Sequence, residues 1–198
     1  MELTISHPGK RLRRPMTIRI IPPSPGSAQP SEEPNGAIVS IPTAATLAPQ
    51  AYEQLLHSCT AAMPNEACGV LAGTIQRIDG GAPVVNVTHV YSILNAAAED
   101  GVNNSFAFEP ASWIQTLYHM QNNRQSLVGY YHSHPASPPL PSASDMIGIR
   151  EAAARDTSYW IISLANSARQ PVVQPYWIHN DPNGQLCCSP LMLTEIRI

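Results

Sequence analysis

The chain has 198 residues, of which 43% are hydrophobic, and this is enough to bury one sizeable core. The formal net charge of −3 and the isoelectric point near 6.1 give no electrostatic reason to expect nucleic acid or an anionic membrane as a partner. The sequence contains neither an apolar run close to the ~18 residues that a membrane span needs nor a secretory signal, so it predicts a cytoplasmic protein.

Residues 1–36 have the composition of a disordered tail. Five early basic side chains are followed by a proline-rich run that cannot bury enough apolar surface to offset chain entropy. MTIRII, residues 16–21, is the exception and is apolar enough to add an edge strand. The basic residues favour a solvated tail, with contact to an acidic partner as the alternative. We therefore expect a folded domain over residues 37–198.

The first half of that domain predicts a strand, a helix and a hairpin. AIVSI, residues 37–41, is a short β-run, and a helical pattern from Pro49 to Met63 places apolar side chains on one face. CGVLAGTIQRI and APVVNVTHVYSIL are rich in β-branched residues and flank a glycine turn, which favours a β-hairpin. Gly69 and Gly73 interrupt the first of these strands, and this indicates a close backbone approach or a bulge.

The second half alternates loops, helices and β-runs. A polar loop over residues 95–105 and a short strand, FAFE, precede a helix from Pro110 to Asn122, because proline suits a first helical turn. A strand over 127–134, a proline-rich loop and a helix over 144–155 follow. SYWIISL, PVVQPYWI and QLCCSPLML add further β-runs. This order predicts an α+β (mixed α/β) domain around a curved sheet.

The four cysteines do not form a recognisable metal or disulfide framework. They are Cys59, Cys68, Cys187 and Cys188, with no Cys-x-x-Cys spacing, and reduced core thiols are the expected state. Cys187 and Cys188 are adjacent, and neighbouring side chains on a strand point to opposite faces. The sequence leaves the role of this pair open.

A candidate metal site lies after the middle of the chain. His132 and His134 are two residues apart on a predicted strand, so both imidazoles lie on one face. Asp145, near the start of the next helix, can turn a carboxylate toward them. Two histidines and one carboxylate leave a fourth tetrahedral position open, as in catalytic zinc sites. The alternatives are two solvent-facing histidines and a helix capping box formed by Ser142 and Asp145.

Together these residues read His-Ser-His-Pro, six residues, Ser, two residues, Asp. This pattern closely resembles the motif of the JAMM metalloprotease family, also called the MPN-plus or JAB domain. The upstream element of that motif is present as PNEACGVLAG, with Glu66 at the position of the family's carboxylate. The segments EACGVLAG and GYYHSHP look most similar to those of the bacterial and archaeal Mec-type members.

The resemblance implies a fold, a cofactor and a mechanism. The fold is a single JAB/MPN domain with a curved, mostly antiparallel sheet flanked by two or three helices. One Zn²⁺ per chain is held by His132, His134 and Asp145. Glu66 acts as the general base for a zinc-bound water, and Ser142 donates a hydrogen bond to the oxyanion.

The resemblance also implies a substrate class. The expected reaction is hydrolysis of a peptide or isopeptide bond at or near the C-terminus of a ubiquitin-like or sulfur-carrier protein, whose tail could lie along a sheet edge. The rival hypotheses are a non-catalytic MPN scaffold and a zinc amidohydrolase acting on other small peptides. The exact substrate and the oligomeric state, for which a dimer is one option, are not determined by the sequence.

Overall fold

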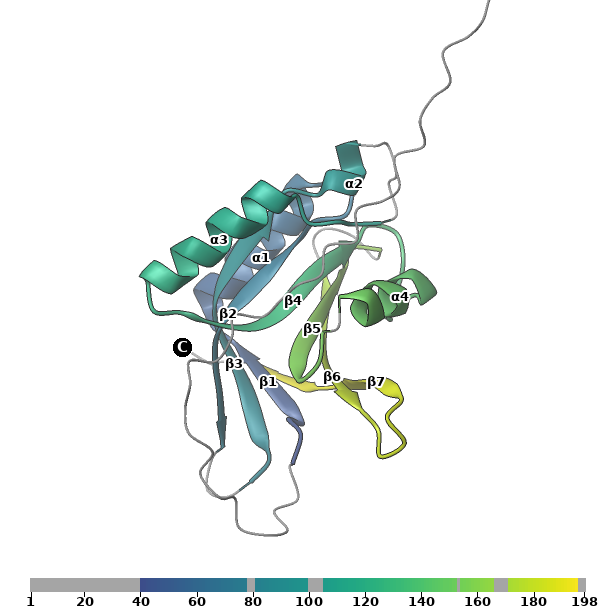
Figure 1. Cartoon of the computed structure of the whole chain (residues 1–198). Helices are drawn as coiled ribbons and strands as arrows, with labels where there is room; N and C mark the ends of the chain where they lie inside the picture. Colours follow the sequence, from purple (N-terminus) through teal and green to yellow (C-terminus); the bar gives the residue numbers. More distant parts are fainter. Residues whose placement is uncertain (1–39, 78–80, 100–104, 153, 166–170, 196–198) are drawn as a thin grey trace, which may run out of the picture.

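The computed structural model describes residues 40–77, 81–99, 105–152, 154–165 and 171–195, and these form one sheet with helices on both faces (Figure 1). The sheet has the strand order β7-β6-β5-β4-β2-β3-β1-β8. The strands are β1 (Ala44–Leu47), β2 (Cys68–Arg77), β3 (Pro83–Ile93), β4 (Ser126–His134), β5 (Thr157–Ser163), β6 (Val172–Asn180), β7 (Leu186–Pro190) and β8 (Met192–Glu195). The helices are α1 (Pro49–Ala61), α2 (Ala96–Glu99), α3 (Pro110–Asn122) and α4 (Ala143–Glu151).

The sheet is mixed, and the predicted α+β class is confirmed. Within the described residues, four strand pairings are antiparallel and three are parallel. The predicted hairpin is β2 and β3, while its turn at 78–80 lies outside the described residues. The central strand β4 runs antiparallel to β2 and parallel to β5. The antiparallel pairing brings the carboxyl end of β4 beside the start of β2.

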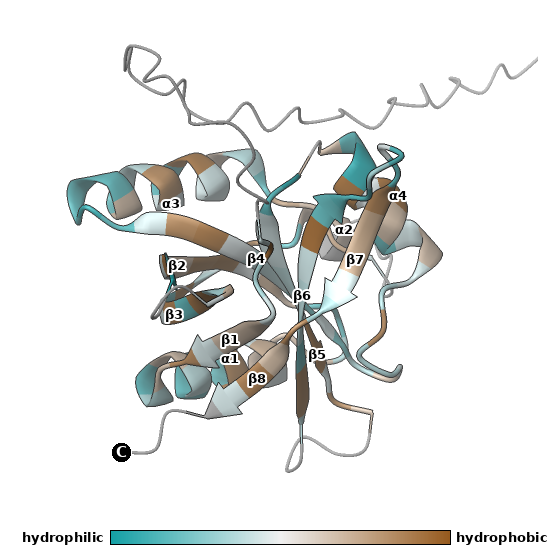
Figure 2. Ribbon diagram, turned by 90° about the horizontal axis from the view of Figure 1, so that it is seen from below, coloured by the Kyte–Doolittle hydropathy of each residue, from teal (hydrophilic) through white to brown (hydrophobic). Residues whose placement is uncertain are grey.

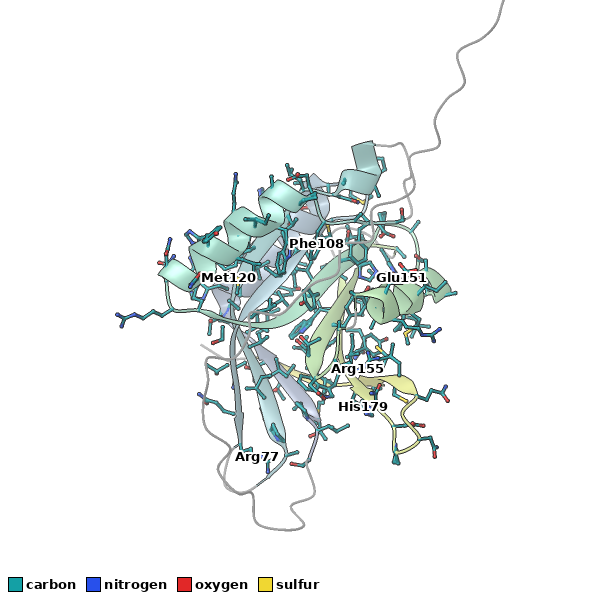
Figure 3. All side chains as sticks on the ribbon, viewed as in Figure 1. Arg77, Phe108, Met120, Glu151, Arg155 and His179 are labelled. Atoms are coloured by element: carbon teal, nitrogen blue, oxygen red, sulfur yellow. The ribbon has the colours of Figure 1, made fainter. Side chains whose placement is uncertain are left out.

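Each face of the sheet is covered by different helices. On one face, Leu55 and Cys59 of α1 pack on Trp160 and other residues of the largest core cluster. On the other face, α3 buries Trp113 and Met120 against β2, and α4 buries Ile149 against β5 and β6. Figure 2 shows α3 and α4 on the opposite side of the sheet from α1. Phe108 and Met120, labelled in Figure 3, belong to the apolar cluster between α3 and the sheet.

The first and last strands of the described part of the chain, β1 and β8, pair with each other, and no pattern in the sequence predicts this. We expected a strand over 37–41, but residues 40 and 41 are not in a strand and residues 37–39 lie outside the described residues, as do 1–36 with the expected edge strand at 16–21. Strand β1 begins at Ala44, where it pairs in parallel with both β3 and β8. The predicted terminal run is divided into β7 and β8 at the buried Leu191. Strand β7 pairs with β6, whereas β8 pairs with β1 at the other end of the sheet.

Two local predictions around residue 100 are also corrected. The segment expected to be a polar loop contains the short helix α2. FAFE is not a full strand, because a single bridge joins Phe108 to Asn95. The helix predicted at Pro110–Asn122 is confirmed as α3, and the carboxylate of Glu109 caps it by accepting from the Ala111 and Ser112 N–H groups.

No helix in the described part of the chain is long and apolar enough to cross a bilayer.

The four cysteines form no disulfide with one another, and two of them lie in the core. Cys59 and Cys68 are buried, and burial raises the pKa of both thiols to about 12. Cys187 and Cys188 are half-buried neighbours on the edge strand β7. All four thiols are free.

Candidate metal centre

Two strands bring the motif's histidines and its upstream glutamate to one edge of the sheet. Strand β4 ends in His132, Ser133 and His134, and His132 is paired with Cys68 of β2. The hydrogen bonding between β4 and β2 continues one residue beyond this pair, where Ser133 N–H donates to the Ala67 carbonyl at 2.9 Å. Because the strands are antiparallel, Glu66 then lies opposite His134. The pairing of β2 with β4 thus places a carboxylate beside the imidazoles.

Asp145 reaches the same place from the first turn of α4. Ser142 is the N-cap of this helix, and its Oγ accepts from Asp145 N–H at 3.1 Å. In return, Asp145 Oδ2 accepts from Ser142 N–H at 2.7 Å, which completes a capping box. The box fixes the carboxylate, while Oδ1 lies 3.3 Å from His132 Nε2. The capping arrangement and the approach to the histidines therefore coexist.

The three side chains have a geometry that suits one divalent ion. His132 Nε2 and His134 Nε2 are 2.9 Å apart, and His134 Nε2 lies 3.6 Å from Asp145 Oδ2. Ligand atoms of a tetrahedral zinc site, with bonds of about 2.0–2.1 Å, are roughly 3.3 Å from one another. All three residues are buried, and this group contains no fourth His, Cys, Asp or Glu from the described residues. The donor set therefore fits an ion that keeps an open position.

The protonation states of the group also suit a metal. Burial lowers the pKa of His132, so its imidazole is neutral at pH 7. Burial opposes ionisation of Asp145, but its contacts with His132 and His134 outweigh this and hold the pKa of the carboxyl well below its usual range. Metal ligation requires a neutral imidazole and an ionised carboxylate. These two residues meet that requirement without rearrangement.

His134 is oriented by a backbone carbonyl. Its Nδ1 lies 2.7 Å from the Pro138 carbonyl oxygen, which can only accept, so Nδ1 carries the proton and the lone pair of Nε2 is available to a metal ion. Burial lowers the pKa of His134, but the Asp145 carboxylate and this carbonyl outweigh it and the net shift is upward. A proton therefore competes with the metal at this ligand as the pH falls.

The proline-rich loop that supplies this carbonyl is anchored at three successive residues. Ser163 Oγ donates to the Ser137 carbonyl at 2.6 Å, and Tyr176 OH donates to the Pro139 carbonyl at 2.7 Å. Pro138 between them accepts from His134. The loop is consequently held against β5 and β6 on both sides of the carbonyl that orients His134.

His132 is enclosed by aromatic rings. Phe106 stacks on it with ring centroids 4.7 Å apart, and Tyr159 packs at 5.2 Å. The imidazole has no solvent exposure, and its Nδ1 has no hydrogen-bond partner among the described residues. These rings exclude water from one side of the group, which strengthens electrostatic interactions there.

A cleft with a volume of about 370 Å³ opens on the other side. It is lined by Glu66, His134, Asp145, Ser142, Ser144 and three residues of the loop, Pro135, Ala136 and Ser137. Burial raises the pKa of Glu66 to about 7, against an opposing effect of His134. Ser142 Oγ is 2.8 Å from Ser144 Oγ. The cleft thus brings together four of the five residues that the sequence motif singled out, while the fifth, His132, is not among its lining residues.

Several residues that shape the site were not identified from the sequence. The sequence pattern predicts strands at Phe106 and Tyr159 and a proline-rich loop at Pro138, and it assigns none of the three a role at the site. Their contacts with the histidines join segments about 25 residues apart or, for Pro138, depend on a backbone carbonyl. Residue type and spacing carry no signal for contacts of this kind. The other described histidines, His57, His89, His119 and His179, are not in the metal-capable group.

Comparison with known families gives one match over most of the folded region. The family described as prokaryotic homologs of the JAB domain matches residues 48–178. This range includes Glu66 and the complete downstream motif.

Two curated relatives carry the name Desampylase. The one from Haloferax volcanii is 40% identical over 82 residues, covering 41% of this chain and 52% of the relative. The one from Pyrococcus furiosus is 28% identical over 102 residues, covering 52% of this chain and 64% of the relative. The chain therefore spans between about half and two thirds of the length of these relatives.

Solved structures agree with the fold. A protein from Desulfitobacterium hafniense, known from a solution structure, is 34% identical, with a TM-score of 0.58 over 77% of this chain and 94% of the other. A Salinibacter ruber protein is 24% identical, with a TM-score of 0.50 over 75% of this chain and 91% of the other, and shows the fold alone.

Proposed function

Since this chain belongs to the family of prokaryotic homologs of the JAB domain, we propose that it is a zinc-dependent peptidase or isopeptidase that cleaves an amide bond at or near the C-terminus of a ubiquitin-like protein. The observation that carries the proposal is the buried His132, His134 and Asp145 group, of which His134 and Asp145 line a cleft together with Glu66. Two imidazoles, a carboxylate and a nearby second carboxylate are the parts that metal-assisted hydrolysis requires.

The substrate class is supported by the relatives. The two curated relatives that align with this chain are both named Desampylase, and the resemblance of the motif implies a ubiquitin-like or sulfur-carrier protein as substrate. The cleft is small, with about 370 Å³, and this suits an extended tail better than a folded surface. We propose that a flexible carboxy-terminal tail, of a ubiquitin-like or sulfur-carrier protein, enters it.

The residues of the cleft would divide the chemistry as follows. His132, His134 and Asp145 would hold zinc, which when bound supplies Lewis acidity and lowers the pKa of water from ~15.7 toward ~7. Glu66 would accept the proton of the attacking water and pass it to the leaving amine. Burial raises the pKa of Glu66 to about 7 in the metal-free chain, and a bound cation beside it would favour the ionised carboxylate that accepts a proton.

Ser142 would stabilise the oxyanion. Its Oγ faces the cleft and accepts from Asp145 N–H, so its own proton is available to a substrate oxygen when Ser144 donates to it. The hydroxyl would therefore serve the helix cap and the reaction at the same time. We expect Ser142→Ala to lower kcat and also to weaken α4, because one substitution removes both contacts.

The test combines metal analysis with two substitutions. Protein purified without chelator should contain about one zinc per chain, and it should release a C-terminal extension from a ubiquitin-like protein, read by intact mass. Glu66→Gln should keep the zinc and lose roughly 10²- to 10⁴-fold in rate, as expected for loss of a general base. His134→Ala should lose both. Near-normal turnover by Glu66→Gln would exclude it as the base, and a protein with neither metal nor activity would favour a binding module.

A further inference from the structure

Asn95, which follows strand β3, uses the whole hydrogen-bonding capacity of its side chain. Its Nδ2 donates to the Glu66 carbonyl at 2.9 Å and to the Ser105 carbonyl at 3.1 Å. Its Oδ1 accepts from the N–H groups of Ala97 and Ala107, both at 3.0 Å. Two carbonyls on one side and two N–H groups on the other fix the orientation of the amide.

This one amide links two segments that both border the candidate site. The first is the backbone of Glu66, just before β2. The second is the segment 105–108, which also pairs with Asn95 through its backbone, since Ala96 N–H donates to the Ala107 carbonyl at 2.8 Å. Phe106 of that segment stacks on His132. The Asn95 side chain therefore connects the backbone of Glu66 to the segment whose Phe106 covers His132.

We propose that Asn95 is a positioning residue for the reaction, which holds Glu66 and the 105–107 segment in one fixed arrangement. The inference rests on the proposed function. Glu66 precedes the first residue of β2, so its backbone needs support beyond the end of the strand. A general base must stand within about 2.6–3.2 Å of the proton that it takes. A displacement of about 1 Å can cost 10²-fold in rate.

The metal ligands are held by other contacts. His132 and His134 are fixed by β4 and by the Pro138 carbonyl, and Asp145 is fixed by the capping box of α4. The Asn95 side chain bonds to none of these three residues. Its loss should therefore displace the base without releasing the ion.

The informative variant is Asn95→Asp. It keeps an oxygen for Ala97 and Ala107 but replaces the amide donor with an oxygen that faces the Glu66 and Ser105 carbonyls. The matched control is Asn86→Ala on β3, a half-buried asparagine whose side chain bonds Thr46 at 2.8 Å and the Val84 carbonyl at 3.4 Å and takes no part in the candidate site.

We expect Asn95→Asp to lower kcat by roughly 10- to 100-fold, with KM within about twofold of the parent and zinc content unchanged. In the Glu66→Gln background the same substitution should have almost no further effect, because a residue that acts through Glu66 loses its target. Amide hydrogen exchange at Ala97 and Ala107 should stay slow in Asn95→Asp and become faster in Asn95→Ala. Asn86→Ala should leave kcat within about twofold.

Three results would overturn the proposal. Parental kcat in Asn95→Asp, a full additive loss in the Glu66→Gln background, or zinc loss with KM and kcat changed together would each assign Asn95 a purely structural role. If Asn95→Asp does not fold, Asn95→Ser decides by the same double-mutant comparison. A parent without zinc and without activity would remove the proposed function itself, and the positioning role with it, so the two failures are distinguishable.

Discussion

At the scale of single residues, Asp145 has two tasks in this chain. One oxygen of its carboxylate caps helix α4 through Ser142 N–H, and the other lies toward His132. The sequence offered these as competing interpretations, yet the structure contains both. The cap fixes the carboxylate before any ion binds, so less side-chain entropy has to be lost on binding.

The pKa of Glu66 predicts how the stability of the metal-stripped protein depends on pH. Burial raises this pKa from 4.5 to about 7, so the folded state binds the proton more tightly than the unfolded state. The stability that the protonated group contributes is present below pH 4.5 and is lost as the pH rises through 7. Glutamine does not ionise, so Glu66→Gln avoids the loss of stability that ionisation of the buried carboxyl causes. At pH 8 the substitution should therefore stabilise the protein by on the order of 2–3 kcal/mol.

The measurement is thermal unfolding in chelator at pH 5 and pH 8. We expect the parent and Glu66→Gln to have similar Tm values at pH 5, and Glu66→Gln to have the higher Tm at pH 8. A difference between the two proteins that does not change with pH would show that Glu66 is not desolvated in solution.

At the scale of elements, the sheet requires glycine at Gly73 of β2. The pairing with β3 shifts register between Ala72 and Gly73, as the sequence predicted for this strand. A Cβ at Gly73 would lie 1.8 Å from the Asn86 carbonyl oxygen and 2.9 Å from its carbon. These are backbone atoms of β3, which cannot move away without disturbing the pairing of the two strands. Gly73→Ala should therefore destabilise the protein by about 1–3 kcal/mol, or more, as overpacking does.

Gly148 provides the opposite case in the same molecule. It lies within α4, and a Cβ added there has no heavy atom within 4 Å. Because alanine favours the helix over glycine, Gly148→Ala should stabilise by about 0.5–1 kcal/mol. Urea unfolding of the two variants beside the parent measures both effects. Equal midpoints for Gly73→Ala and the parent would mean that β2 and β3 can separate at this position.

At the scale of the whole molecule, the metal-capable group joins a strand to a helix on the face opposite α1. His132 and His134 belong to β4 and Asp145 belongs to α4, so one ion would connect two elements. An ion that binds the folded chain alone stabilises it by mass action, by about 2.7 kcal/mol at a free concentration of 100 times Kd. We expect zinc to raise the Tm of the stripped protein.

The control for this prediction is His134→Ala, whose Tm should not respond to zinc at the same concentration. Calorimetry or fluorescence-detected melting with and without zinc is sufficient. An equal rise in parent and variant would place the ion elsewhere on the chain, and no rise in either would argue against a metal site in this fold.

The sequence by itself determined the features that depend on short spacings. Period two on a strand places His132 and His134 on one face, and Pro110 and Pro49 open the helices that they were expected to open. Such features depend on neighbours within one turn or one pleat, and a local pattern therefore predicts them.

Only the tertiary structure determined which residues of distant segments face each other. Glu66 faces His134 because β2 and β4, about 60 residues apart, pair in one register. The joining of β1 to β8 and the four bonds of Asn95 likewise connect distant segments. Strand register is set by the burial of both sheet faces together, and no local pattern in a single sequence contains that information.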